Sequence, residues 1–340
     1  KKFYKTKGNT FVRIDGPVDK EQEMKVLGSG QAEMGENGMG ITMAKRYDMK
    51  NGKTYIIDEG AITGARKSVA GTLAGIEEFS DFYDVLLLSG AVNRKNTKDG
   101  WLGLGQDDNE GNLLNIKTYG DVGAEDVPAG KTKGKDTKVT YLVNNYHYTV
   151  YAPTNKAMQE AFAKGLPTPD MIAELELEIE MAPAELQDSL QTVLDSKKEA
   201  MLDFVKYHIQ DNSVFVDNGF ATGKYESAKT ELIHASEDEE SGVTSDMWTP
   251  GRPYKINVAE VSANGMKVID NMGTEHVIRT DLKNIMAREY WVKTAKDITD
   301  PETLEIESSS FIVIHGIDSP LLYDYDPKDL KNHNQFEYKY

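Results

Sequence analysis

The sequence predicts an α+β fold, with helices in the middle of the chain and strands at its end. Apolar residues recur at intervals of three and four across residues 67–92 and again across 186–208, which is the spacing of one face of a helix. Runs rich in Val, Ile, Thr and Tyr follow at 254–262 and 311–317, as is typical of strands. Since helices and strands are segregated along the chain, the pattern does not fit the alternation of a parallel α/β sheet.

The first 63 residues have the pattern of short strands and turns. Residues 10–14 alternate between apolar and polar, and Asn51-Gly52 predicts a hairpin turn that leads into a strand at 53–58. The five glycines between residues 28 and 40 predict a loop. A long polar loop or a small strand excursion is expected at 93–140, which is rich in Gly, Asp and Lys.

Three helices are expected between residues 156 and 208. The first follows Ala152-Pro153-Thr154-Asn155, where proline favours an extended backbone and the Thr154 and Asn155 oxygens are expected to cap the new helix. Pro153, Thr154 and Asn155 are therefore predicted to be structural, with ligand binding as the minor alternative. The second helix should span about 170–181, and a strand is expected at Ser213–Val216.

Composition narrows the class of partner. The net charge of −17 makes nucleic acid an unfavourable partner, because an acidic surface repels phosphate backbones. The absence of cysteine excludes disulfides and zinc–thiolate sites. No apolar run approaches the ~18 residues of a spanning helix, so the chain is expected not to cross a membrane.

Three segments of the sequence carry a family likeness. Residues 148–158 place an apolar strand before Ala-Pro-Thr-Asn and a helix, Tyr207-His208 ends a later helix, and residues 311–322 combine an apolar strand with His315, Asp318 and two leucines. In this order the segments resemble the signatures of the fasciclin domain. The resemblance implies a β-sandwich or wedge flanked by helices, with 151–155 close to 311–322.

The resemblance also implies a division of the chain. Residues 65–327 are expected to form one fasciclin-like domain with long insertions, and residues 328–340 a surface tail. Residues 1–64 are expected to be the C-terminal part of a preceding, incomplete module, because the strand at 52–58 is similar to the closing signature. Tyr55 stands where histidine is usual in that signature.

The candidate binding residues fall in two groups. Tyr207 and His208 match a pair that the family links to adhesion and receptor binding, and a packed, hydrogen-bonded pair is the alternative. Trp101, Trp248 and Trp291 lie in or beside the predicted insertions, where a Trp either anchors its loop or offers a flat face to a protein or a sugar ring.

No catalytic, metal or cofactor site is predicted. Gly-x-Ser-x-Gly does not occur, and the six histidines lack the spacing of a metal-binding helix. His315 and Asp318, three positions apart on or just after a strand, should face opposite sides and are expected to be structural. Asp318 is expected to accept hydrogen bonds from the backbone or a turn.

Three functions are consistent with these features. The resemblance implies a non-catalytic, extracellular protein that mediates adhesion or serves as an accessory subunit of an outer-membrane transport complex, similar to surface lipoproteins of Bacteroidota anchored through a segment outside these residues. The alternative is a glycan-binding surface module that uses the tryptophans. A hydrolase hidden in the insertions would need a cleft with convergent acid and base groups.

Overall fold

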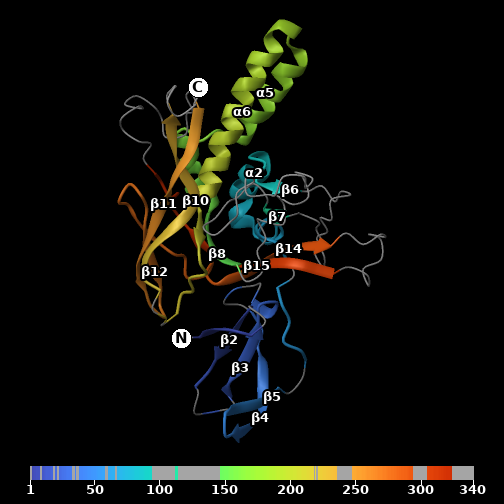
Figure 1. The fold of residues 1–340 in the computed structure, drawn as a ribbon, viewed down its shortest axis with the longest axis vertical. Helices are drawn as coiled ribbons and strands as arrows, with labels where there is room; N and C mark the ends of the chain where they lie inside the picture. The colour runs from blue at the N-terminus through green and yellow to red at the C-terminus, as the bar shows by residue number, and fades with distance from the viewer. Residues whose placement is uncertain are drawn as a thin grey trace, which may run out of the picture.

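The α+β class is confirmed by the computed structural model (Figure 1). Helices lie against a large curled sheet, and a second sheet formed by the N-terminal residues lies at one end of the molecule. The structure describes residues 2–7, 10–17, 20, 23–32, 35, 38–57, 60–65, 67–93, 112–113, 146–217, 219, 221–235, 247–293 and 305–323.

The large sheet has eight strands in the order β13-β12-β11-β10-β9-β8-β15-β14. The pairing of β8 with β15 is parallel, and the other neighbours are antiparallel. The strands are β8 Tyr146–Pro153, β9 Ile209–Asp211, β10 Gly223–Ala235, β11 Met247–Val261, β12 Met266–Ile269, β13 Glu275–Val277, β14 Ile285–Lys293 and β15 Glu305–Ile317.

The sheet curls until its two parts meet. Ile278, just after β13, bridges Ile317 in β15, and the Arg279 amide donates to the Gly316 carbonyl oxygen at 2.9 Å. The space inside the curl is filled by an apolar cluster that includes four buried tyrosines: Tyr151, Tyr207, Tyr254 and Tyr323. This curled sheet with its own core is the expected wedge.

The helices cover the other side of the sheet and form the larger core with it. Phe79, Phe82 and Phe204 are fully buried there. Thr168 accepts from the Met171 amide, and Pro169 occupies the first helical position, so the start of α5 agrees with its local sequence. The helices are α1 Val69–Ala74, the 3₁₀ turn η3 Glu77–Phe79, α2 Ser80–Leu88, α4 Asn155–Ala163, α5 Pro169–Met181 and α6 Ala184–Tyr207.

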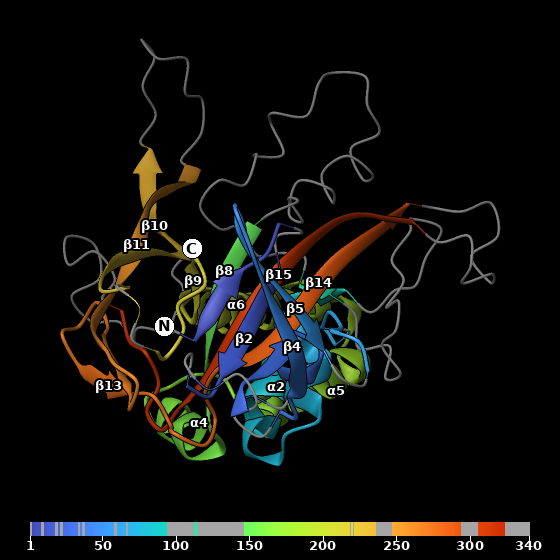
Figure 2. The ribbon, with the colours of Figure 1, turned by 90° about the horizontal axis from the view of Figure 1, so that it is seen from below.

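The N-terminal sheet is a meander that docks on the large sheet. Its strands follow chain order: β1 Phe3–Lys5, β2 Phe11–Asp15, β3 Lys25–Gly28, β4 Ile41–Met49 and β5 Gly52–Ile57. Figure 2 shows this meander in front of β8, β15 and β14. Phe3 stacks on Phe215 with ring centroids 4.1 Å apart, and the Asp217 carboxylate accepts from the Lys2 and Phe3 amides.

Several details differ from the sequence predictions. Ser213–Val216 is irregular, because the Val214 and Val216 amides donate to the side chains of Thr149 and Asn284 and not to a strand. Strand β14, with buried Ile285, Met286 and Ala287, had not been expected. Within 93–140, by contrast, the pairing of β7 (Asn112–Leu113) with β6 (Val92–Asn93) agrees with the expected alternative of a small strand excursion. The remainder of 94–140 and the tail 328–340 lie outside the described residues. The domain division stays a prediction.

Candidate functional site

The two longest signature segments lie side by side, as predicted. Strands β8 and β15 pair in register, with Ala152 opposite Gly316 and Pro153 opposite Ile317. Beyond the strands, the Thr154 hydroxyl donates to Asp318 Oδ1 at 3.0 Å. A Cβ on Gly316 would lie 2.7 Å from the Leu282 Cβ and 3.2 Å from the Phe79 ring, so glycine permits the close approach of these neighbours.

The cap position predicted at Thr154 is confirmed, but the side-chain hydrogen bonds expected from Thr154 and Asn155 to the new helix are wrong. Thr154 occupies the cap position of α4 without a side-chain hydrogen bond to that helix. Asn155 instead joins α4 to the start of α2: its Oδ1 accepts from the Asp81 amide at 3.0 Å, and its Nδ2 donates to the Glu77 carbonyl oxygen at 3.0 Å. These partners come within reach only because α2 packs beside α4.

Asn155→Ala should lower the free energy of unfolding by about 1–2 kcal/mol, because it leaves the Asp81 amide and the Glu77 carbonyl without this partner. Urea denaturation followed by circular dichroism measures the change. Gln159→Ala is the matched control, since Gln159 also bonds α2 but through a solvent-exposed hydrogen bond to the Asp81 carboxylate. Equal losses in the two variants would contradict the assigned role of Asn155.

Tyr207 and His208 are fully buried, so neither presents a surface to a partner in this structure. His208 Nε2 accepts from the Leu321 amide at 3.0 Å, which leaves Nδ1 to donate to the Phe204 carbonyl oxygen at 2.8 Å. The Tyr207 hydroxyl accepts from the Asn271 amide at 2.7 Å. The packed, hydrogen-bonded alternative therefore describes this pair, and burial lowers the pKa of His208 to about 3.

His315 and Asp318 have separate structural contacts. His315 Nδ1 accepts from the Asn284 amide at 3.2 Å and Nε2 donates to the Val214 carbonyl oxygen at 2.8 Å, while burial lowers the pKa of His315 to about 4. Asp318 accepts from Thr154 and, at 3.1 Å, from Arg279, so its donors are side chains and not the expected backbone amides.

A hydrogen-bonded series of side chains runs from Ser319 through His276 to Asp270, and no spacing in the sequence predicts it. His276 Nδ1 lies 2.7 Å from Ser319 Oγ, and His276 Nε2 donates to Asp270 Oδ2 at 2.9 Å. A catalytic triad has this order of groups, but it also needs an oxyanion site and a substrate cavity beside the serine. Asp270 also accepts from the Thr274 and Leu322 amides. We assign these three side chains a structural role, because their hydrogen bonds connect the residues after β15 to the turn after β12.

The structure does not test the three tryptophans as a site. Trp101 lies outside the described residues. Trp248 is on β11 opposite His234, and Trp291 is on β14 opposite Ser308. The structure describes the backbone at both positions, so their use as sugar platforms stays a prediction.

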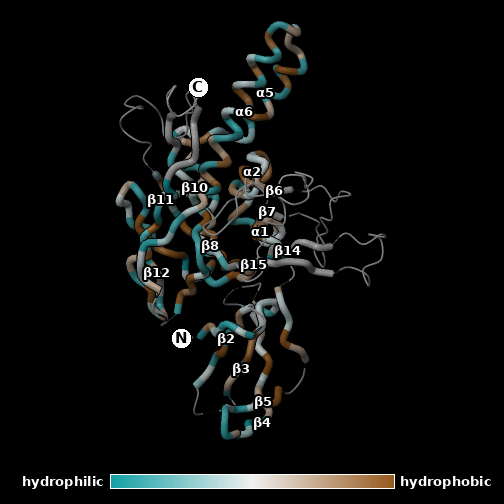
Figure 3. The backbone as a smooth tube through the Cα atoms, viewed as in Figure 1, coloured by the Kyte–Doolittle hydropathy of each residue, from teal (hydrophilic) through white to brown (hydrophobic). Residues whose placement is uncertain are grey.

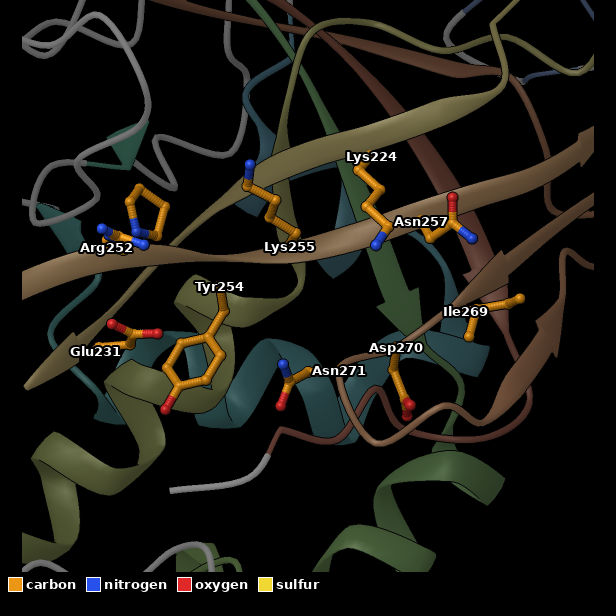
Figure 4. A pocket seen from close by; sticks show the side chains of 10 residues that line it. Lys224, Glu231, Arg252, Tyr254, Lys255, Asn257, Ile269, Asp270 and Asn271 are labelled. Carbon is orange, nitrogen blue, oxygen red and sulfur yellow. The ribbon is translucent and has the colours of Figure 1, made fainter. Parts of the chain in front are cut away.

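A surface pocket of about 450 Å³ opens beside β10, β11 and the turn after β12 (Figure 4). Three cationic side chains line it, Lys224 from β10 and Arg252 and Lys255 from β11. The amides of Asn257 and Asn271 line it as well. Tyr254, Ile269, Pro253, Glu231 and Asp270 complete the lining.

The second distinctive surface is the helical hairpin formed by α5 and α6, which extends away from the rest of the molecule (Figure 1). Apolar and hydrophilic segments alternate along it to its end (Figure 3). Leu177 is 58% exposed, Met181 78% and Leu186 53%. Residues 165–196 contain eight carboxylates and no Lys or Arg: Asp170, Glu174, Glu176, Glu178, Glu180, Glu185, Asp188 and Asp195.

Comparison with solved structures gives a likeness of low overall similarity. The chain is similar to a FAS1 domain pair from the insect cell adhesion molecule fasciclin I, with a TM-score of 0.31 and 14% sequence identity over 95% of this chain and 70% of that chain. No family model matches the chain, and no curated protein matches it.

Within the described ranges, no group of three or more His, Asp or Glu side chains is arranged to hold a metal ion. In the same part of the chain, no helix is long and apolar enough to cross a membrane. The hairpin and the cationic pocket are therefore the two features that we consider for function.

Proposed function

We propose that this chain is a non-catalytic, extracellular protein that acts at a cell surface by binding another protein. The observation that carries the proposal is the hairpin of α5 and α6, which combines exposed apolar side chains with an excess of negative charge. Exposed apolar area in a contiguous patch favours association, since burial releases about 25 cal/mol per Å².

The charge of the hairpin specifies the kind of partner. Residues 165–196 hold eight carboxylates, of which Glu176 pairs with Lys198, and the remaining excess creates a negative potential around the apolar end. Such a field speeds encounter with a cationic surface and opposes association of two copies through the same helices. The partner is therefore a protein with an apolar groove rimmed by Lys or Arg.

The resemblance in the signature segments supports an extracellular setting, and a subunit of an outer-membrane transport complex is the specific assembly that we propose. In this arrangement the signature residues hold the core, and contact with the partner is made by the hairpin. The buried positions of Tyr207 and His208 agree with that distribution of roles.

Affinity capture from native membranes, followed by mass spectrometry, tests the proposal. The wild-type chain should enrich a membrane protein, and the triple variant Leu177→Ser, Met181→Ser, Leu186→Ser should lose most of it. The control is the double variant Met272→Ser, Val277→Ser. These side chains are also about half exposed, at 50% and 57%, but they lie in β13 and the turn before it, outside the hairpin. If the triple variant captures as much of the membrane protein as wild type, the hairpin is not the contact surface. If the wild-type chain enriches no membrane protein, the proposed protein-binding function is wrong.

A further inference from the structure

The pocket beside β10 and β11 has a charge that differs in sign from the charge of the whole protein. The chain carries 56 acidic and 39 basic residues, yet three of the charged side chains that line this pocket are Lys224, Arg252 and Lys255. Random placement on such an acidic surface would favour carboxylates. The local excess of cations points to an anionic ligand.

These cations are not used by internal ion pairs in the part of the chain that the structure describes. Other surface cations there have carboxylate partners, such as Lys198 with Glu176 at 2.7 Å and Lys267 with Glu275 at 3.1 Å. Lys224, Arg252 and Lys255 have no carboxylate oxygen within 4.0 Å among the described residues. The pocket thus holds cationic groups that a bound anion can meet.

Two carboxylates, Asp270 and Glu231, also line the pocket, so its three cations leave an excess of one positive charge. Asp270 is buried and bonds His276 and the amides of Thr274 and Leu322, so its oxygens are already satisfied. Glu231 is the remaining acidic residue of the lining. Figure 4 shows Glu231 and Arg252 on one side of the pocket, with Lys224 and Asn257 on the other.

The remaining groups of the pocket define the ligand further. Asn257 and Asn271 each carry an amide that can both donate and accept, which suits hydroxyl groups that do the same. The planar guanidinium of Arg252 matches a carboxylate or sulfate through paired hydrogen bonds. A volume of about 450 Å³ lies at the lower end of the range for small-molecule sites.

We infer that this pocket binds an acidic sugar unit, one that bears a carboxylate or a sulfate, as part of a glycan. Arg252 and Lys255 hold the anionic group, Lys224 adds long-range attraction, and the two asparagines meet the ring hydroxyls. The site is distinct from the α5–α6 hairpin and uses none of the three tryptophans. Failure of this inference would leave the proposed protein contact intact.

Isothermal titration calorimetry with defined probes tests the inference on the full chain. A hyaluronan hexasaccharide supplies carboxylates, a heparin-derived hexasaccharide adds sulfates, and maltohexaose is the neutral counterpart. At least one acidic hexasaccharide should bind about tenfold or more tightly than maltohexaose at 50 mM salt, and binding should weaken at 300 mM salt. A hexaglutamate peptide, which has charge without ring hydroxyls, should bind more weakly than that sugar.

Variants locate the site. Arg252→Ala and Lys255→Ala should each weaken binding of the acidic sugar by about tenfold, because each removes a charge-assisted contact. Lys53→Ala is the control, since Lys53 is an exposed lysine on the other sheet. Both pocket residues are exposed, so the fold should be retained in a circular dichroism spectrum. The inference is overturned if neither acidic hexasaccharide binds, or if maltohexaose or hexaglutamate binds equally well. It is also overturned if both pocket variants bind the acidic sugar with unchanged affinity.

Discussion

Asp203→Ala should lower the free energy of unfolding by about 3–5 kcal/mol, the range for breaking a buried ion pair by removing one partner. Asp203 on α6 pairs with Lys229 on β10, and their side chains are 5% and 4% exposed. Burial raises the pKa of Asp203 and lowers the pKa of Lys229, while the opposite charge of each partner works against these shifts. Alanine leaves the lysine buried without the carboxylate.

The comparison variants make this prediction specific. Replacing both residues, with Asp203→Leu and Lys229→Met, should recover much of the loss, because no charge is then buried. Lys198→Ala breaks the ion pair with Glu176, in which the lysine is 32% and the glutamate 49% exposed. This variant should lose less than about 1 kcal/mol of unfolding free energy. Urea unfolding gives all three values. An Asp203→Ala loss no larger than the Lys198→Ala loss would show that burial does not set the strength of the pair.

Acidification from pH 7 to pH 5 should destabilise the fold through His208 and His315. Burial lowers the pKa of His208 from 6.5 to about 3 and that of His315 to about 4, so the folded protein binds fewer protons than the unfolded chain below pH 6.5. Their stabilising contribution is therefore complete above the unfolded pKa and is lost as the pH falls towards the folded values. Each histidine should account for about 2 kcal/mol at pH 5, at about 1.4 kcal/mol per pH unit.

The pH dependence can be assigned to a residue with a neutral variant. His208→Gln cannot take up a proton, so the difference in unfolding free energy between pH 7 and pH 5 should shrink by about 2 kcal/mol, whatever the variant does to stability at pH 7. Asp84 acts in the opposite sense, because burial raises its pKa and the folded protein then takes up a proton more readily. If His208→Gln keeps the full wild-type dependence, His208 is not buried in its neutral form.

The signature segments and the proposed contact surfaces occupy different parts of the molecule. Thr154, His208, His315 and Asp318 bond to residues of the chain itself, so their hydrogen-bonding capacity is used within the fold. The hairpin and the pocket lie on the surface and hold exposed apolar or cationic side chains. A partner can consequently bind without disturbing the core that the signature residues hold together.

The candidate surfaces were only partly predictable. The composition of 165–196 is visible in the sequence, but whether Leu177 and Met181 face a core or solvent depends on what packs beside the hairpin. The residues that line the pocket are far apart in the sequence, such as Lys224 on β10 and Asn271 in the turn after β12. No spacing rule joins such positions, because the pairing of β10, β11 and β12 brings them together.

The sequence by itself determined the types of the helices between residues 155 and 207 and where α5 and α6 begin. Proline geometry and capping act within about one turn, so Pro169 and Pro183 mark α5 and α6 wherever these helices lie. Only the tertiary structure decided the partners of the polar side chains. Asn155 bonds α2 in place of its own helix, and His208 meets Leu321, 113 residues away, because hydrogen bonds are made by groups that packing brings within about 3 Å.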